Sequence, residues 1–271
     1  MIGSIIGDTV VSIYEFNNIK TKTFDFWDYG MEPTDDSVLT FATADWILHG
    51  GEAWKHYYEY AREYDDPSGG YGGSFLRYVQ NIAKGGEPRP YNSCGNGSAM
   101  RVAPVGWAFE TRQEVLAAAK MSAECTHNHP EGVKGAEATA LAIFMARKGA
   151  SKEEIKTMME SEYGYSLDFT LDELRPAYSW RFQGAALCQG TVPQAFRCVY
   201  EAADFEDCIR NAVSLGGDSD TLACIAGGIA EAVFGVPKKF YDYEVKLLKA
   251  RYPKFVGLLR EFERKFGSGV V

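Results

Sequence analysis

The chain has 271 residues, of which 46% are apolar, and it carries a formal net charge of −9. This apolar fraction is enough for one substantial core, and the negative charge disfavours nucleic acid or an anionic membrane as the main partner. No two of the six cysteines lie closer than ten residues, so the sequence has no CxxC zinc or redox signature. Scattered thiols are typical of a reducing compartment.

The N-terminal segment MIGSIIGDTVV is apolar, but it has no basic residue and Asp8 interrupts it. We interpret this segment as part of the folded protein and not as a signal peptide. No apolar run is long enough to span a bilayer. We therefore expect a cytoplasmic, monomeric protein without a membrane partner, folded as a single domain over residues 1–271.

Helix signals occur along most of the chain, whereas the period-two patterns of strands are nearly absent. The first clear helix start is PTDDS, in which Thr34 can act as the N-cap. A loop-rich segment, 65–91, follows and surrounds one short helix. Two capping boxes open later helices: SKEE at Ser151, whose helix should end near Gly164, and TLDE at Thr170.

The same signals continue toward the C-terminus. Asp204 can cap a helix that ends at Gly216, and Asp218 is the natural N-cap of the next helix, DSDTLACIAGGIAEAVFG. A last helical run, 238–266, is broken into two pieces by Pro253. These patterns predict an all-α fold.

Two of these helix starts carry more negative charge than a cap needs. Asp218 and Asp220 follow a glycine pair, Asp35 and Asp36 follow Thr34, and both pairs lie in long stretches without Lys or Arg. One such aspartate alone is most simply a response to the free N–H groups and the helix dipole. If the two starts meet in space, the four carboxylates must raise their pKa values, recruit distant cations or bind metal. Oxygen ligands without His or Cys favour Mg²⁺, Mn²⁺ or Ca²⁺ over Zn²⁺.

Three other features are ambiguous by themselves. The stretch GNGSAMRV could cradle a phosphate on backbone N–H groups, although an ordinary loop turn is the simpler interpretation, and no third glycine or preceding strand supports a Rossmann site. His127 and His129 could form part of a zinc site, but no other soft ligand has a useful spacing. Glu15, taken alone, is most simply a surface carboxylate at a helix end.

At these motifs the sequence resembles the ADP-ribosylglycohydrolase family, and the resemblance covers most of the chain. The resemblance implies a compact, single-domain, orthogonal helical bundle with a two-metal site at one end. One departure is Val11, where the first motif of the family usually has Gly, and we expect a local packing shift there without loss of chemistry. The matches, in chain order, are GDTVVSIYE (7–15), TDDS (34–37), GNGSAMR (95–101), THNHPEG (126–132) and GGDSDT (216–221).

The resemblance also implies a set of site residues. Glu15 would lie on a mobile loop that closes over the site, whereas Asp8 would make structural hydrogen bonds. Two divalent cations, Mg²⁺ or Mn²⁺, would be held from two sides, with Asp220 as the bridging ligand. The implied metal ligands are Thr34, Asp35 and Asp36 on one side and Asp218, Asp220 and Thr221 on the other.

The implied ligand is an ADP-ribosyl group. Its diphosphate and the neighbouring ribose would be bound by one loop together with His127, and we expect Tyr91 to stack on the adenine, while His129 receives no role. The acceptor group would contact the variable segment 65–86. The implied binding loop consists of Ser93, Cys94, Gly95, Asn96 and Gly97.

The implied activity is metal-dependent hydrolysis of the glycosidic bond between ADP-ribose and an acceptor on a protein or a small molecule. Either Asp36 or Glu15 would orient or deprotonate the attacking water. Two alternatives stay open. A two-metal phosphohydrolase would use a similar acidic site and phosphate loop. A catalytically silent ADP-ribose-binding protein should have lost metal ligands, whereas this chain keeps all six.

Overall fold

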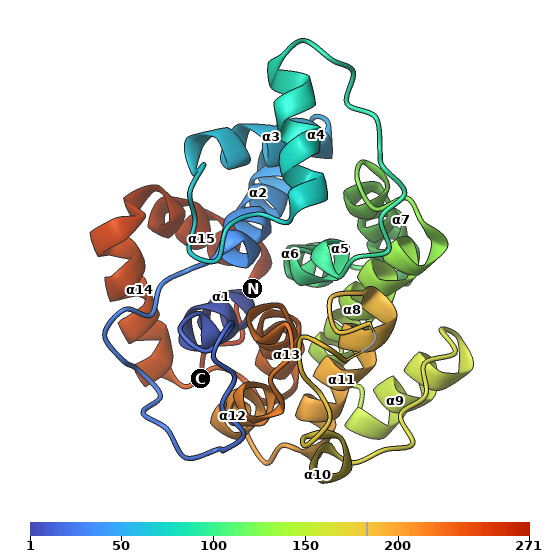
Figure 1. The fold of residues 1–271 in the computed structure, drawn as a ribbon, viewed down its shortest axis with the longest axis vertical. Coiled ribbons are helices and arrows are strands. Elements are labelled where there is room, and N and C mark those ends of the chain that lie inside the picture. The colour runs from blue at the N-terminus through green and yellow to red at the C-terminus, as the bar shows by residue number, and fades with distance from the viewer. Residues whose placement is uncertain (183) are drawn as a thin grey trace.

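The computed structural model describes residues 1–182 and 184–271, and its regular elements are helices joined by loops (Figure 1). Strand pairing in these residues is limited to isolated bridges such as that between Thr34 and Ser68. The predicted all-α fold is confirmed. The helices are α1 (Ile2–Val11), α2 (Asp35–His49), α3 (Ala53–Glu63), α4 (Gly73–Ala83), α5 (Gly97–Met100), α6 (Ala103–Ala108), α7 (Arg112–Glu124), α8 (Pro130–Arg147), α9 (Lys152–Ser161), α10 (Leu171–Leu174), α11 (Cys188–Glu201), α12 (Phe205–Leu215), α13 (Ser219–Phe234), α14 (Lys238–Arg251) and α15 (Pro253–Phe266).

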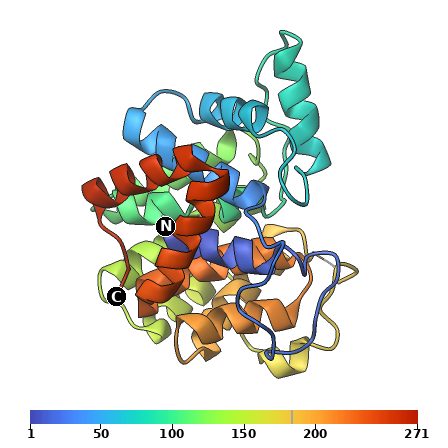
Figure 2. The same cartoon turned by 90° about the vertical axis from the view of Figure 1, so that its left-hand side faces the viewer.

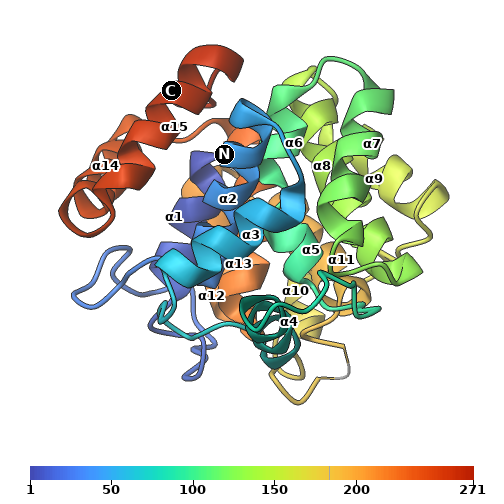
Figure 3. The ribbon, with the colours of Figure 1, turned by 90° about the horizontal axis from the view of Figure 1, so that it is seen from above.

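Helix α1 lies inside the molecule and packs most closely against α13. Figure 1 shows α1 enclosed by α2, α12, α13 and α14, and Figure 3 shows the same neighbours from above. All ten residues of α1 are buried. A Cβ atom on Gly7 would lie 2.1 Å from the carbonyl oxygen of Ala223, and one on Gly3 would lie 2.3 Å from that of Gly227. The glycines therefore allow a backbone contact that fixes α1, and with it Asp8, in the interior.

The C-terminal end of α1 is tied to the start of α2 through Asp8. The Asp8 carboxylate accepts hydrogen bonds from the N–H groups of Thr34 (2.9 Å) and Ser37 (3.1 Å) and from both of their hydroxyl groups. These bonds satisfy N–H groups that a helix start leaves free. Asp8 thus has the structural role expected for it, while Val11 lies fully buried at the last position of α1.

Most predicted helix boundaries are confirmed. Ser151 and Thr170 each form a capping box with the glutamate three residues later, and the helix that follows Ser151 ends at Ser161. Asp204 caps α12 through the N–H group of Asp207 at 2.8 Å. Pro253 is the first residue of α15, so it separates the last two helices as predicted.

The two C-terminal helices and α4 occupy the outside. Helices α14 and α15 form a crossed pair on the face turned to the viewer in Figure 2, where α14 contacts α1 and α15 contacts α2. The predicted single helix of the segment 65–91 is α4, and it stands at the edge of the molecule (Figure 1). None of the helices in the described residues is both long and apolar enough to cross a membrane.

Candidate metal and ligand site

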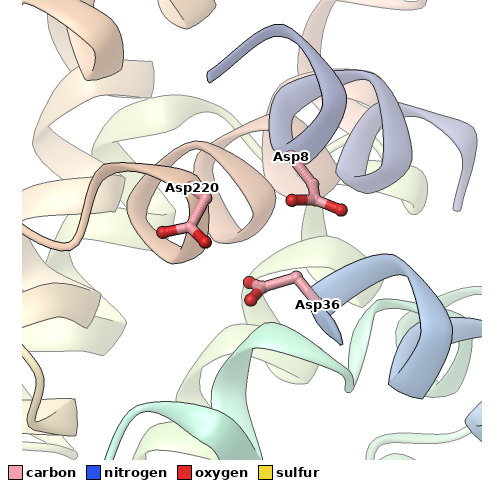
Figure 4. Close-up of side chains that lie close together, drawn as sticks. All are labelled: Asp8, Asp36 and Asp220. Atoms are coloured by element: carbon pink, nitrogen blue, oxygen red, sulfur yellow. The ribbon is translucent and has the colours of Figure 1, made fainter. Parts of the chain in front are cut away.

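The two acidic helix starts meet in space. Carboxylate oxygens of Asp8, Asp36 and Asp220 lie within 4.8 Å of one another, and Figure 4 shows the three side chains converging from α1, α2 and α13. A second group, formed by Glu15, Asp218 and Asp220, meets the same limit. Asp220 belongs to both groups, so the two sets of carboxylates form one continuous cluster.

Several oxygens of this cluster are buried without a hydrogen-bond partner. They are Oδ1 of Asp36, Oδ1 of Asp220 and Oε2 of Glu15. Buried polar atoms in folded proteins are usually satisfied, so three orphaned oxygens in one place require an explanation. Carboxylate and hydroxyl oxygens are ligands that Mg²⁺, Mn²⁺ and Ca²⁺ prefer. The residues present therefore fit divalent cations.

The pKa values of these carboxyl groups reflect the same absence of neutralising partners. Burial, and then repulsion from neighbouring carboxylates, raises the pKa values of Asp35, Asp36 and Asp220 well above their usual range. Burial and the charge of Asp218 raise the pKa of Glu15 to about 7. Without a cation, part of the cluster must therefore hold protons at neutral pH.

The threonines of the two helix starts connect the ligand groups. The Thr34 hydroxyl accepts from the N–H group of Asp36 (3.2 Å) and donates to Asp8, so Thr34 caps α2 as predicted. The Thr221 hydroxyl donates to Oδ2 of Asp36 at 3.2 Å, which joins the start of α13 to the start of α2. Asp35 is half-buried and lines the pocket beside the cluster.

Asp218 departs from its expected local role. It occupies the predicted N-cap position of α13, but its side chain makes no capping hydrogen bond. Its carboxylate instead accepts from Nδ2 of Asn96 at 2.7 Å. The side chain is thus turned toward the Ser93–Gly97 loop, and it links that loop to the carboxylate cluster.

A pocket of about 410 Å³ opens onto the cluster, a size typical of sites for small ligands. Its wall includes five residues predicted to bind ADP-ribose, and also Tyr91, whereas Cys94 and Thr34 lie outside the lining. The carboxylates that line it are those of Glu15, Asp35, Asp36, Asp218 and Asp220, and the predicted ligand-binding residues are Ser93, Gly95, Asn96, Gly97 and His127.

The two histidines of THNHP have different surroundings. His127 is 6% exposed, and its ring lies 5.8 Å from the ring of Tyr91. Nδ1 of His129 accepts from the N–H group of Glu131 at 3.1 Å, so His129 is the N-cap of α8. In the described part of the chain neither histidine belongs to a group of residues that could hold a metal ion.

Glu15 is not the surface carboxylate that its isolated position suggests. Only 7% of the residue is exposed, and a Cβ atom on Gly69 would lie 2.5 Å from its Oε2. The loop at Gly69, which has a φ of 76°, therefore covers this carboxylate from the segment that precedes α4.

Sequence reasoning missed the aromatic residues at the mouth of the pocket. The rings of Phe16 and Trp180 stack with 6.0 Å between centroids and 9° between planes, although these residues are 67% and 40% exposed. Nε1 of Trp180 donates to the carbonyl oxygen of Glu15 at 2.7 Å. The position of Phe16 directly after Glu15 was a usable signal, whereas no motif surrounds Trp180. Tyr71, Phe75 and Arg101 also line the pocket.

Mg²⁺ is expected to raise the melting temperature by more than NaCl of equal ionic strength does. A ligand at a hundredfold excess over its dissociation constant stabilises the folded state by about 2.7 kcal/mol. Without metal, the carboxyl groups of Asp8 and Glu15 have pKa values of about 6 and about 7, against about 4 in the unfolded chain. A carboxyl group whose pKa is raised by folding stabilises the folded state at pH values below its unfolded pKa. This stabilisation is lost as the pH rises through the folded pKa.

The Mg²⁺ effect should therefore be larger at about pH 8 than at about pH 5, where protons already neutralise the cluster. Thermal unfolding at both pH values, with Mg²⁺ or matched NaCl, measures this difference. A shift equal to that with NaCl at both pH values would contradict a metal site in the cluster.

The chain is similar to known proteins along most of its length. A sequence model described as ADP-ribosylglycohydrolase matches residues 1–242. Among the relatives, human ADP-ribosylhydrolase ARH3 is 28% identical in an alignment that covers 86% of this chain and 84% of the human protein. The zebrafish (Danio rerio) ADP-ribosylhydrolase ARH3 is 25% identical over 87% of this chain and 82% of its own length.

Two further similarities are more limited. ADP-ribosylarginine hydrolase Tri1 of Pseudomonas putida is 28% identical over 54% of this chain and 40% of its own length. A solved structure titled ADP-ribosylglycohydrolase-related protein complex superposes with a TM-score of 0.70 over 97% of this chain and 95% of that chain, at 24% identity. The solved structure supports the fold.

Proposed function

Because this chain belongs to the ADP-ribosylglycohydrolase family, we propose that it hydrolyses the glycosidic bond between ADP-ribose and an acceptor and releases ADP-ribose. One observation carries the proposal: buried carboxylates with unpartnered oxygens share a pocket with the glycine loop and His127. The carboxylates suit cations that hold a sugar, and the glycine loop with His127 suits a diphosphate. The names of the human and zebrafish relatives support the same activity.

We propose that the cations are Mg²⁺ or Mn²⁺, since all the available donors are hard oxygens. When bound, such ions orient a substrate and stabilise the charge that develops during the reaction. The fit of the site rests on the orphaned oxygens of Asp36, Asp220 and Glu15. The proposed ligands are Thr34, Asp35, Asp36, Asp218, Asp220 and Thr221.

The reaction adds a water oxygen to the anomeric carbon of the distal ribose and breaks the bond from that carbon to the acceptor. The electron pair leaves with the acceptor, which takes up a proton, and the transition state resembles an oxocarbenium ion. Glu15 has a free Oε2 and a raised pKa, so its carboxylate suits transfer of a proton from the water. Asp36 is the second candidate for this role, through its unpartnered Oδ1.

Contacts between neighbouring residues support a proposed order of the subsites. The glycine loop reaches the cluster through the bond from Asn96 to Asp218, Asp218 lies beside Glu15, and Glu15 is bonded to Trp180. If the diphosphate lies at His127 and the scissile bond at the carboxylates, the acceptor lies on the Trp180 side. We therefore assign the stacked rings beside Glu15 to the acceptor.

The Phe16–Trp180 end of the pocket favours a flat, positively charged acceptor. Arg101 is the one Lys or Arg residue among the described lining residues, and it contacts Thr126 at the other end of the pocket. Exposed aromatic faces beside carboxylates attract a guanidinium group. We propose ADP-ribosylated arginine as the preferred substrate, and the name of the Pseudomonas putida relative supports this choice.

Replacing Trp180 with alanine is expected to lower kcat/KM for an ADP-ribosylated arginine peptide by about threefold to thirtyfold, the range of one cation–aromatic contact. Free ADP-ribose should bind as before, because the acceptor is absent from it. Trp180→Phe loses the hydrogen bond to Glu15 but retains an aromatic ring. It should therefore keep most of the activity. The control is Tyr243→Ala, which removes another exposed ring that stacks on Trp27. Equal losses for arginine- and serine-linked substrates would contradict this assignment.

The decisive test of the proposed activity is an assay of the purified protein with Mg²⁺ or Mn²⁺ against arginine-, serine- and acetyl-linked ADP-ribose. Release of free ADP-ribose that stops with EDTA and returns with Mg²⁺ supports the proposal. AMP or inorganic phosphate as the product would indicate a phosphohydrolase instead. Binding of ADP-ribose without any turnover would indicate a silent binding protein.

A further inference from the structure

Behind His127 lies a buried hydrogen-bonded chain to which the proposed reaction gives no role. Arg101 is fully buried, and its guanidinium lies 3.9 Å from the centre of the Tyr57 ring. Nη2 of Arg101 donates to the carbonyl oxygen of Ser122 at 2.6 Å and to the hydroxyl of Thr126 at 2.8 Å. The Thr126 hydroxyl in turn lies 2.8 Å from Nδ1 of His127. Thr126 and His127 of the THNHP motif thus belong to a chain of hydrogen-bonded side chains, here called the relay, that runs from Arg101 to the pocket.

The donors in this relay determine where the proton of the imidazole lies. A guanidinium can only donate, so the Thr126 hydroxyl must accept from Arg101. Its single proton is then free for another acceptor, and Nδ1 of His127 lies 2.8 Å from this hydroxyl. An unprotonated Nδ1 can accept this proton and so completes the relay, whereas an Nδ1–H group cannot accept it.

The other ring nitrogen faces the glycine loop. A Cβ atom on Gly97 would lie 3.0 Å from Nε2 of His127, and one on Gly95 would lie 3.6 Å away. Because glycine has no Cβ, the loop leaves space beside this nitrogen, and Gly95, Gly97 and His127 line the same pocket. A proton on Nε2 therefore points to the place where the proposed function puts the diphosphate.

We propose that Thr126, itself held by Arg101, fixes His127 in the Nε2–H tautomer so that the ring donates a hydrogen bond to a phosphate oxygen of the ligand. Thr126 and Arg101 are then positioning residues that act through His127. The phosphate part of this inference rests on the proposed function, whereas the tautomer does not.

The charge state of the ring agrees with this arrangement. Burial, and then the neighbouring Arg101, lowers the pKa of His127 well below its usual value. The ring is therefore neutral at physiological pH, and a neutral imidazole has one donor and one acceptor nitrogen. Its orientation toward the ligand thus depends on a hydrogen bond to the acceptor nitrogen, which Thr126 supplies.

Nitrogen NMR of the protein labelled with ¹⁵N-histidine tests the tautomer without any ligand. The chain has four histidines, and the signals that disappear in His127→Gln belong to His127. We expect the pattern of a neutral ring protonated at Nε2. A ring protonated at Nδ1 would overturn the inference, whatever the substrate of the protein is.

Substitutions at Thr126 test the relay itself. Thr126→Val removes the hydroxyl and keeps the shape, Thr126→Ala is a second variant without it, and Thr126→Ser restores it. The matched control is Thr139→Val, because Thr139 is a buried threonine whose hydroxyl has no partner. We expect mixed tautomers in the variants without the hydroxyl, and the Nε2–H form in Thr126→Ser and in the control.

Calorimetry with free ADP-ribose and Mg²⁺ completes the test. If the fraction of His127 in the Nε2–H form falls to between about a third and a tenth of its original value, the apparent dissociation constant for ADP-ribose should rise by about threefold to tenfold. Thr126→Ser and Thr139→Val should bind like the unmodified protein. Unchanged tautomer and affinity in Thr126→Val would overturn the relay. If the unmodified protein does not bind ADP-ribose, the proposed function fails, and the NMR result still decides the role of Thr126.

Discussion

Replacing Asp220 with alanine is expected to abolish turnover and to weaken the binding of Mg²⁺ and of ADP-ribose together. Asp220 is the member shared by both carboxylate groups, and its Oδ1 has no partner within the protein. Loss of its side chain therefore removes an oxygen from both parts of the cluster. Substitution of residues that only support metal ligands costs about tenfold to a hundredfold in affinity or activity. Loss of a shared ligand should exceed that range.

Asp204→Ala is the matched control for this prediction. Asp204 also stands at a helix start, but its side chain is a simple cap for α12. Its loss should cost about 1 kcal/mol of stability and should leave Mg²⁺ binding unchanged. Calorimetry on both variants, with and without Mg²⁺, separates the two roles. If Asp220→Ala binds Mg²⁺ and ADP-ribose normally, Asp220 only belongs to the first turn of α13, and GGDSDT is not a metal motif.

Local signals predicted the helices well because the responsible interactions are local. The capping boxes at Ser151 and Thr170 join residues three apart, and Pro253 separates α14 from α15 by its own covalent geometry. Asp218 shows the limit of the same logic. Its position predicts a cap, but a tertiary bond to Asn96 engages the carboxylate instead.

The composition of the candidate site was predictable, whereas its assembly was not. The excess negative charge at two helix starts indicated that something must neutralise it. That these starts meet depends on the contact between α1 and α13 and on the hydrogen bonds from the start of α2 to Asp8. Both contacts join residues far apart in the sequence, and no local pattern encodes them.

The residues that sequence reasoning missed share a physical cause. Trp180 comes from the loop before α11 and donates a hydrogen bond to the backbone carbonyl of Glu15. Thr126 and Arg101 are joined through a hydrogen bond between side chains. Each of these roles depends on a partner that is distant in the sequence, so the residue type alone carried no sign of it.

Glu15→Gln is expected to lower kcat by at least about a hundredfold, the low end for a group that transfers a proton. Glutamine fills the same space as the glutamate but cannot take a proton from water. Binding of ADP-ribose should persist, because glutamine keeps the shape of the side chain and removes only its charge. Asp36→Asn should cause a similar loss of turnover, and it should also weaken Mg²⁺ binding, because Asp36 belongs to the group around Asp8 and Asp220.

The two variants together decide which carboxylate accepts the proton. Rates with an ADP-ribosylated arginine peptide at saturating Mg²⁺, and calorimetry with ADP-ribose, measure the two effects separately. Glu87→Gln is the control, since Glu87 is exposed and lies outside the pocket lining. If Glu15→Gln keeps kcat within about tenfold of the unmodified protein, its loss is too small for a general base. Proton transfer would then fall to Asp36, whose Oδ1 is also buried without a hydrogen-bond partner.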